Sequence, residues 1–136
     1  MYLQSELQKY IYTTFTTTAS LSTTPFYLNH APQDTSYPIV TYNVISNVPS
    51  MAMGSTGNDY GTYRIQFQVF VNEPDYSAGM TILNDIESAF HRQSNVTLSN
   101  DVTLICAKVQ GNVVTFFNDE EKVWQISEDY SFMVGK

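Results

Sequence analysis

Apolar residues recur with two periods along this chain, and each period predicts a different kind of element. In residues 2–17 the apolar side chains are spaced about four residues apart, which places them on one stripe of a helix: Leu3, Leu7, Ile11 and Phe15. In residues 60–71 they alternate with polar residues, as in a strand that buries one face; the apolar set is Tyr63, Ile65, Phe67, Val69 and Val71. The two patterns predict a helix packed on a sheet.

Both patterns return in the second half of the chain. Asp75 follows the strand-breaking Pro74 and is placed to cap a second helix, whose apolar stripe is Ile82, Ile86, Ala89 and Phe90. Residues 123–134 alternate again, but Glu128 falls on the apolar face, where a carboxylate needs a polar partner or the sheet edge. Further strands are predicted at residues 26–29, 39–48, 95–98, 102–110 and 113–117.

This order of elements predicts a single α+β domain over residues 1–136, a mainly antiparallel β-sheet packed on one face by two α-helices. The amino terminus lacks a basic region followed by an apolar block, which argues against a signal peptide. No apolar run approaches the roughly 18 residues of a membrane span. We therefore expect a protein that is intracellular when made and has no membrane partner.

The composition favours contact with proteins over binding of nucleic acid. The formal net charge is −7 and only six residues are Lys or Arg, whereas phosphate binding needs clustered basic side chains. Ten Tyr and eight Phe are present, and Tyr is enriched at protein interfaces because its ring is apolar and its tip polar. An ordinary sheet protein that uses Tyr within its strands explains the same composition.

No group of residues has the spacing of a catalytic or metal site. His30 and His91 favour solvated or capping roles, and Cys106, in an apolar run, is expected to be buried. The acidic cluster at the predicted turn after residue 118 is expected to be a solvated hairpin tip rather than a divalent-ion site; it consists of Asp119, Glu120 and Glu121. We predict no catalytic residue, no cofactor and no metal, and the protein is not expected to be an enzyme.

A loop without periodicity follows the strand at 39–48 and is a candidate contact for a partner. Exposed methionine is adaptable, which suits a surface that becomes ordered against another protein. The candidate contact residues are Met51, Met53, Gly54, Asn58 and Asp59. The alternative is that the two methionines fold back onto the domain's own core.

A stiff, exposed elbow precedes the same strand. Pro32 and Pro38 each fix φ and remove a backbone donor, and Gln33 and Asp34 between them are turn formers. This segment resembles the Pro-Gln-x-x-x-x-Pro-(aliphatic)-(aliphatic)-x-(aromatic) signature near the start of tail terminator (tail completion) proteins of long-tailed bacteriophages. The order of helix, elbow, strand, loop, strand, helix and β region is similar to that family over nearly the whole chain, although the loop at 48–59 has no match.

The resemblance implies a structural virion protein without enzymatic activity. It would form a homo-hexameric ring on the head-proximal end of the tail tube, end tube polymerisation and provide the head-joining interface. The implied partners are other copies of the chain, the tail tube protein and a head–tail connector or stopper protein. The implied location is the virion tail or neck, with assembly in the host cytoplasm.

Two alternatives remain: another neck component, such as a stopper or head–tail adaptor, or a stand-alone monomeric binding module. Within the ring hypothesis, six copies at −7 each carry about −42. We hypothesise that Asp119, Glu120 and Glu121 lie at a rim or in the lumen. There they would repel DNA phosphates, so that DNA passes through without sequence-specific binding.

Overall fold

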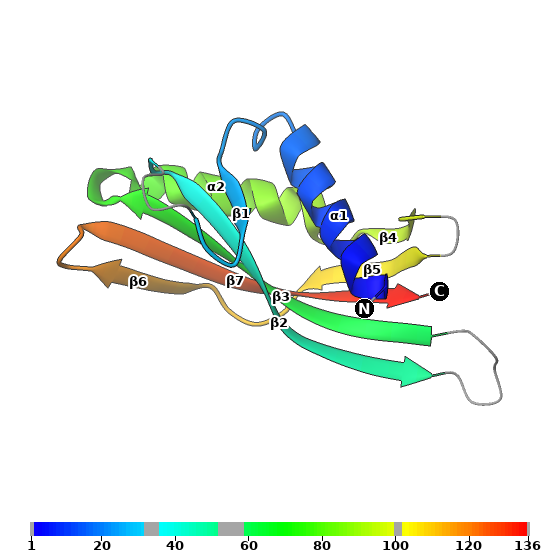
Figure 1. Cartoon of the computed structure of the whole chain (residues 1–136). Helices are drawn as coiled ribbons and strands as arrows, with labels where there is room; N and C mark the ends of the chain where they lie inside the picture. Colours follow the sequence, from blue (N-terminus) through cyan, green and yellow to red (C-terminus); the bar gives the residue numbers. More distant parts are fainter. Residues whose placement is uncertain (1, 32–35, 52–58, 100–101, 136) are drawn as a thin grey trace.

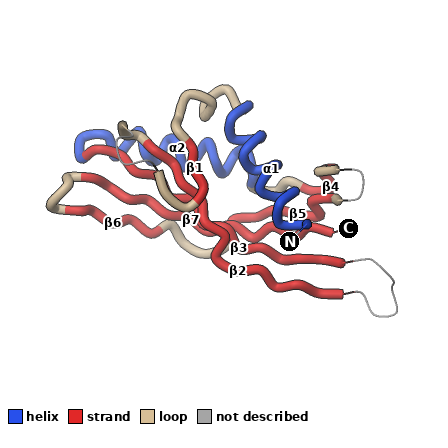
Figure 2. The backbone as a smooth tube through the Cα atoms, viewed as in Figure 1, coloured by secondary structure: helices blue, strands red, loops and turns tan. Residues whose placement is uncertain are grey.

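The computed structural model describes residues 2–31, 36–51, 59–99 and 102–135, and two helices lie on one face of a twisted sheet (Figures 1 and 2). The helices are α1 (Tyr2–Thr17) and α2 (Tyr76–Phe90), and a 3₁₀ turn, η1 (Glu73–Asp75), leads into α2. The strands are β1 (Phe26–Leu28), β2 (Ile39–Met51), β3 (Asp59–Asn72), β4 (Ser94–Thr97), β5 (Thr103–Val109), β6 (Val114–Asn118) and β7 (Val123–Gly135). The predicted α+β class is confirmed.

One strand, β7, organises the sheet. The strand order is β1-β2-β3-β7-β5-β4, and β6 also pairs with β7. On one side β7 pairs with β3 along its full length, and on the other its first half pairs with β6 and its second half with β5. One end of the sheet therefore has the order β1-β2-β3-β7-β6, and the other end has β2-β3-β7-β5-β4. Only β1 and β2 form a parallel pair among these strands.

The core lies between this sheet and the two helices. The alternation predicted for β3 is confirmed, since all five of its predicted apolar residues are buried. The helix stripes also pack inward, with Ala89 only partly buried; the buried helical side chains are Leu7, Ile11, Phe15, Ile82, Leu83, Ile86 and Phe90. At Gly79 α2 approaches the sheet so closely that an added Cβ would lie 2.9 Å from Val71 Cγ2.

A stack of aromatic rings ties α1 to the start of the sheet. Phe26 on β1 lies between Phe15 of α1 and Tyr42 of β2, with ring centroids 3.9 and 4.8 Å away and the planes nearly parallel. All three side chains are buried. Burial of three aromatic rings contributes strongly to stability, so this stack fixes the position of the short strand β1.

The prediction that Cys106 is buried is wrong, because the side chain is exposed. The register between β5 and β7 shifts between Leu104 and Cys106. This irregularity lets Leu104 and Ala107 both face the core and turns Cys106 to the face without helices. An extra residue in one strand inverts the alternation beyond it, and an apolar run does not reveal where that residue lies.

Two local predictions near the strand ends also need correction. Asp75 precedes α2 but makes no capping hydrogen bond through its side chain. The reason is that η1 runs directly into α2, so Asp75 (φ −104°, ψ 24°) lacks the extended conformation of a capping residue. In addition, β2 and β3 continue to Met51 and Asp59, so the paired strands extend into the segment that we expected to be a loop from residue 49.

The packing of the aromatic stack can be tested by replacing a phenylalanine with alanine at a buried site and at an exposed site. Phe26→Ala is expected to lower the free energy of unfolding by about 3–5 kcal/mol, because it leaves a cavity between two rings. Phe116→Ala, at a side chain that is 59% exposed, is expected to change it by no more than about 0.5 kcal/mol. Urea denaturation of both variants measures this, and equal effects would contradict the packing described.

Candidate functional site

The register of the strands separates the predicted contact residues into two groups at opposite ends of the sheet. Met51 and Asp59 face each other as the last residue pair of the β2–β3 hairpin. Met53, Gly54 and Asn58 lie outside the described residues, so the predicted contact loop is placed only through its two ends. Tyr60, the next residue of β3, pairs with Gly135 of β7, so the base of this hairpin lies beside the carboxyl end of β7.

The elbow leads into the other end. Of its four predicted residues, Pro32, Gln33 and Asp34 lie outside the described residues, whereas Pro38 follows a cis peptide bond and β2 begins immediately after it. Ile39 pairs with Phe70, and Phe70 pairs with Gln125 of β7. The start of β2 therefore lies at the same end of the sheet as the β6–β7 turn.

That turn is acidic and exposed. Asp119, Glu120 and Glu121 all have exposed side chains, and the Asn118 Oδ1 atom accepts hydrogen bonds from the backbone N–H groups of Glu120 and Glu121, at 3.0 and 3.1 Å. A side-chain oxygen that binds two successive amides fixes the shape of a tight turn. The carboxylates point to solvent as predicted. Whether they lie at a rim or in a lumen stays a prediction.

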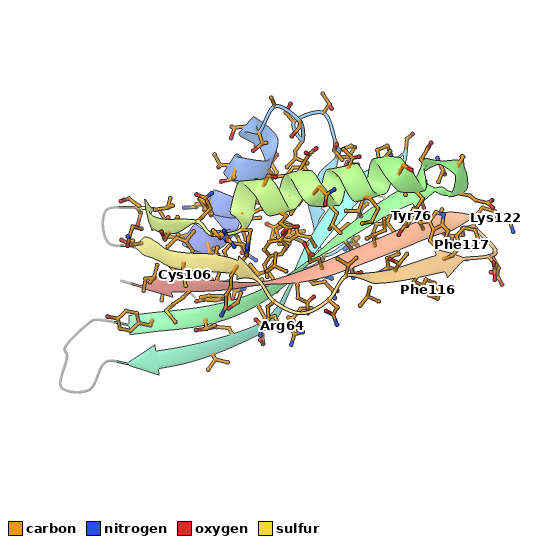
Figure 3. All side chains as sticks on the ribbon, turned by 180° about the vertical axis from the view of Figure 1, so that it is seen from behind. Arg64, Tyr76, Cys106, Phe116, Phe117 and Lys122 are labelled. Atoms are coloured by element: carbon orange, nitrogen blue, oxygen red, sulfur yellow. The ribbon has the colours of Figure 1, made fainter. Side chains whose placement is uncertain are left out.

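An aromatic cluster that no sequence pattern indicated holds the acidic turn against the start of α2. The Trp124 ring lies 4.7 Å from Phe117 and 4.9 Å from Tyr76, measured between centroids, and its Nε1–H donates to the Glu73 carbonyl. The Glu73 N–H in turn donates to the Lys122 carbonyl at 2.9 Å. Figure 3 shows Tyr76, Phe117 and Lys122 gathered at this end of the molecule. The β6–β7 hairpin is thus attached to α2 as well as to the sheet.

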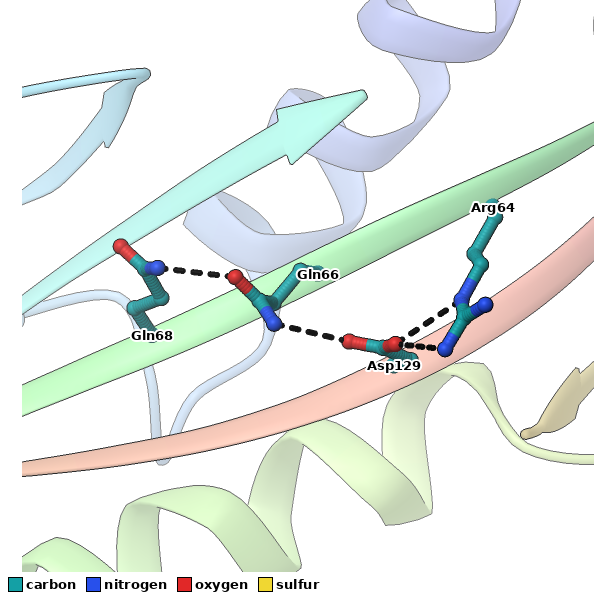
Figure 4. A network of polar contacts seen from close by, with 4 residues as sticks. All are labelled: Arg64, Gln66, Gln68 and Asp129. Atoms are coloured by element: carbon teal, nitrogen blue, oxygen red, sulfur yellow. Dashed lines mark hydrogen bonds and ion pairs between the residues drawn. The ribbon is translucent and has the colours of Figure 1, made fainter. Parts of the chain in front are cut away.

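The face of the sheet without helices carries a polar network at its centre (Figure 4). Asp129 of β7 accepts from Arg64 Nε at 2.8 Å and from Gln66 Nε2 at 3.0 Å, and Gln68 Nε2 donates to Gln66 Oε1 at 2.8 Å. Thr41 on β2 extends it by donating to Gln68 Oε1. These bonds join three strands side by side, so the open face is held together by polar contacts rather than by a second layer.

Apolar side chains are exposed on two strands: Ile45 and Val48 of β2 are 49% and 62% exposed, and a second group lies on β6. Val114 and Phe116 of β6 are 61% and 59% exposed, and the preceding Val113 is 40% exposed. Exposed apolar side chains that lie together on a sheet mark an interaction surface. The sequence predicted a strand here but not that its apolar residues would be exposed, which follows from the lack of a described strand on the outer side of β6.

The other residues singled out for chemistry occupy structural positions. His91 is the capping residue at the end of α2, as predicted, and its backbone N–H donates to the Glu87 carbonyl. Its Nδ1 accepts a hydrogen bond from the Val109 N–H of β5 at 3.0 Å. His30 is exposed. In the described part of the chain, no three His, Cys, Asp or Glu side chains are arranged to hold a metal ion, and no helix there has the length and apolarity to cross a membrane.

Glu128 is the buried acid that the alternation singled out, and it has the polar partner that burial requires. Its side chain is 5% exposed on the helix-covered face, and the Tyr130 hydroxyl donates to Oε1 at 2.8 Å. Burial raises the pKa of Glu128, and the nearby Glu87 and Asp129 carboxylates raise it further, whereas Tyr130 and His91 lower it. Burial also raises the pKa of the Tyr130 hydroxyl.

With this geometry established, comparison with known proteins identifies the family. Residues 12–134 match the family model described as bacteriophage tail terminator protein. The chain belongs to the bacteriophage tail terminator family. This family is a family of structural tail proteins, so the resemblance drawn from the elbow and the order of elements is confirmed.

The fold of this tail terminator also occurs in a solved particle. A chain in the structure titled "Virion of native gene transfer agent (GTA) particle" has a TM-score of 0.76 at 14% sequence identity, with 98% of each chain covered. At this identity the likeness shows a shared fold. No curated protein sequence matches the terminator chain.

The buried acid of this terminator predicts a pH-dependent stability. Because the pKa of Glu128 is higher in the folded chain, the folded state holds a proton that the unfolded state releases, so stability falls as pH rises from about 4.5 through the raised pKa. Glu128→Gln, which keeps an acceptor for Tyr130, is expected to remove this part of the fall and to be at least as stable as the parent at pH 7. Urea denaturation between pH 4.5 and 8 measures both profiles.

Glu120→Gln is the matched control, since Glu120 is exposed and its removal should leave the shape of the profile unchanged. Parallel profiles for the parent and Glu128→Gln would contradict an effect of the buried carboxyl.

Proposed function

We propose that this tail terminator assembles as a ring of identical copies, a hexamer, on the head-proximal end of the phage tail tube. The ring ends tube polymerisation and offers its other face to the head-to-tail connector or stopper protein. The observation that carries this proposal is the family match over residues 12–134. The role requires shape rather than catalysis, and we propose no enzymatic activity.

The geometry of the subunit supports such a role. A subunit in a closed ring needs two different lateral patches for its two neighbours, in addition to the surfaces that meet the tube and the head. This sheet has an apolar exposed strand at β6, a polar open face and two chemically different ends, the acidic β6–β7 turn and the β2–β3 hairpin. One small domain therefore presents the several distinct surfaces that a ring subunit needs. This role does not require a substrate cavity.

Tail length in particles assembled without this protein tests the proposal. We expect tubes that are longer than normal and variable in length, because nothing stops subunit addition, and these tails should fail to join heads. Electron microscopy of infected-cell lysates measures both outcomes, with the parent gene supplied in trans as the control.

Two other outcomes would replace the proposal. Tails of normal length that do not join heads would indicate a stopper or adaptor. A purified chain that stays a 15.4 kDa monomer by light scattering, even with tail tubes added, would indicate a stand-alone binding module.

The acidic turn gives a second prediction within the ring. If its carboxylates border the DNA path, Lys at positions 119, 120 and 121 attracts phosphates and should slow DNA ejection several-fold at low salt, with less effect at high salt. The corresponding Asn and Gln substitutions of Asp119, Glu120 and Glu121 serve as a matched series that removes charge without reversing it, and their effect should be intermediate. Ejection kinetics from purified virions measure this, and unchanged rates in the Lys variant would place the turn away from the DNA.

A further inference from the structure

The β6 strand has a free edge that lacks the usual protection of sheet edges. On one side it pairs with β7, and no other described strand pairs with it. Residues 113–117 include no Pro and no charged residue, and Val113, Val114 and Phe116 are exposed. Natural proteins protect an edge with charges, Pro, bulges or a covering segment, because unpaired N–H and C=O groups otherwise pair with another chain. An edge of this kind is expected to be covered in the assembled protein.

The β4 edge, in contrast, is protected. Its residues Ser94, Asn95 and Thr97 are polar and exposed, and Asn95 has a positive φ of 54°, which interrupts the extended backbone. The strand spans only Ser94–Thr97. A short, polar and irregular edge is a poor template for another strand, so β4 is not the natural partner for β6.

The remaining edge, β1, matches β6 in position. Phe26 pairs with Val40, Val40 with Val69, Val69 with Ile126, and Ile126 with Thr115. These five residues form one row across the sheet, with β1 at one margin and β6 at the other (Figure 1). The two edges therefore lie at the same height along the strands.

The two edges also match in direction. β1 is parallel to β2, and each of the three steps from β2 through β3 and β7 to β6 is antiparallel. β1 and β6 consequently run in opposite directions. A copy translated sideways would place its β1 antiparallel to the β6 of its neighbour, with the helix-covered faces on the same side.

We propose that β6 of one subunit pairs with β1 of the next subunit, so that the sheet continues from copy to copy around the ring. This inference rests on the proposed ring and names its lateral contact. The contact is heterologous, since two different patches meet, and such contacts form a ring when the rotation between copies closes. Pairing in the register of the shared row adds no translation along the strands, as a closed ring requires.

The side chains at the two edges are complementary in this register. With Thr115 opposite Phe26 of the next copy, Val114 lies opposite Tyr27, and Val113 lies opposite Leu28. Val114 is 61%, Val113 40% and Leu28 43% exposed in the single chain, so the pairing brings exposed apolar side chains together. Tyr27 and Val114 share the helix-free face, since Tyr27 pairs with Thr41 and Val114 with Ser127.

The charges around the contact are compatible with it. Because the strands are antiparallel, the acidic turn that follows β6 extends toward the residues that precede β1 in the next copy. Residues 16–25 contain no Asp or Glu and are rich in Ser and Thr. Hydroxyl groups there meet the carboxylates of Asp119, Glu120 and Glu121 without like-charge repulsion.

Engineered cysteines test this contact on the full chain. In a Cys106→Ser background, which removes the exposed native thiol, Val114→Cys is combined with Tyr27→Cys, since opposed strand residues lie within disulfide range. The purified protein is assembled on tail tubes, oxidised and separated on a non-reducing gel. We expect a ladder of covalent oligomers that extends beyond the dimer and disappears on reduction, with rings unchanged in electron micrographs.

The controls separate this contact from its rivals. Val114→Cys alone should stay monomeric on the gel, and covalent dimers from it would indicate β6–β6 pairing and overturn the proposal. A ladder from Val114→Cys with Asn95→Cys, in place of the Tyr27 pair, would assign β4 as the partner and also overturn it. Rings that form without any ladder overturn this contact but leave the proposed function intact, whereas absence of rings in the parent protein overturns both.

Discussion

The pairing of β3 with β7 is the constraint on which the rest of the structure depends. The two strands match residue for residue from Tyr60 opposite Gly135 to Asn72 opposite Val123. Because side chains alternate between faces, a slip of one residue would exchange the buried and exposed sets on both strands. This single register puts the aromatic core under the helices and brings Asp129 of β7 beside Arg64 and Gln66 of β3 on the open face.

Hydrophobic periodicity predicted the helices and strands whose pattern repeats over several residues. It failed where the local structure depends on a single residue. The stripe of α1 and the alternation of β3 and β7 were visible because each involves several residues that share one environment. The exposed Cys106 results from one register shift in β5, and the missing cap at Asp75 results from a 3₁₀ turn that continues into α2. Neither effect has a periodic signature, since both depend on contacts that the neighbouring residues do not specify.

The candidate contact surfaces were also predicted only in part, because a sequence pattern shows local features and not which elements become neighbours. The acidic turn was visible as consecutive charges, and its exposure followed from the cost of burying carboxylates. That it lies at the same end of the sheet as the start of β2 was not predictable, because this requires knowing that β2 starts beside the end of β3 and that β7 lies next along the row. The exposure of Phe116 was hidden as well, since an apolar strand in a sequence looks the same at the margin of a sheet as at its centre.

The tandem arrangement of β6 and β5 along one side of β7 has a consequence for how the subunit moves. Two short strands that share a long neighbour but do not pair with each other can separate from it independently. The β6 half is attached through five residue pairs and the Trp124 cluster, whereas the β5 half is backed by β4 and by α2 packing. A division of this kind lets one margin of the sheet open while the other stays paired.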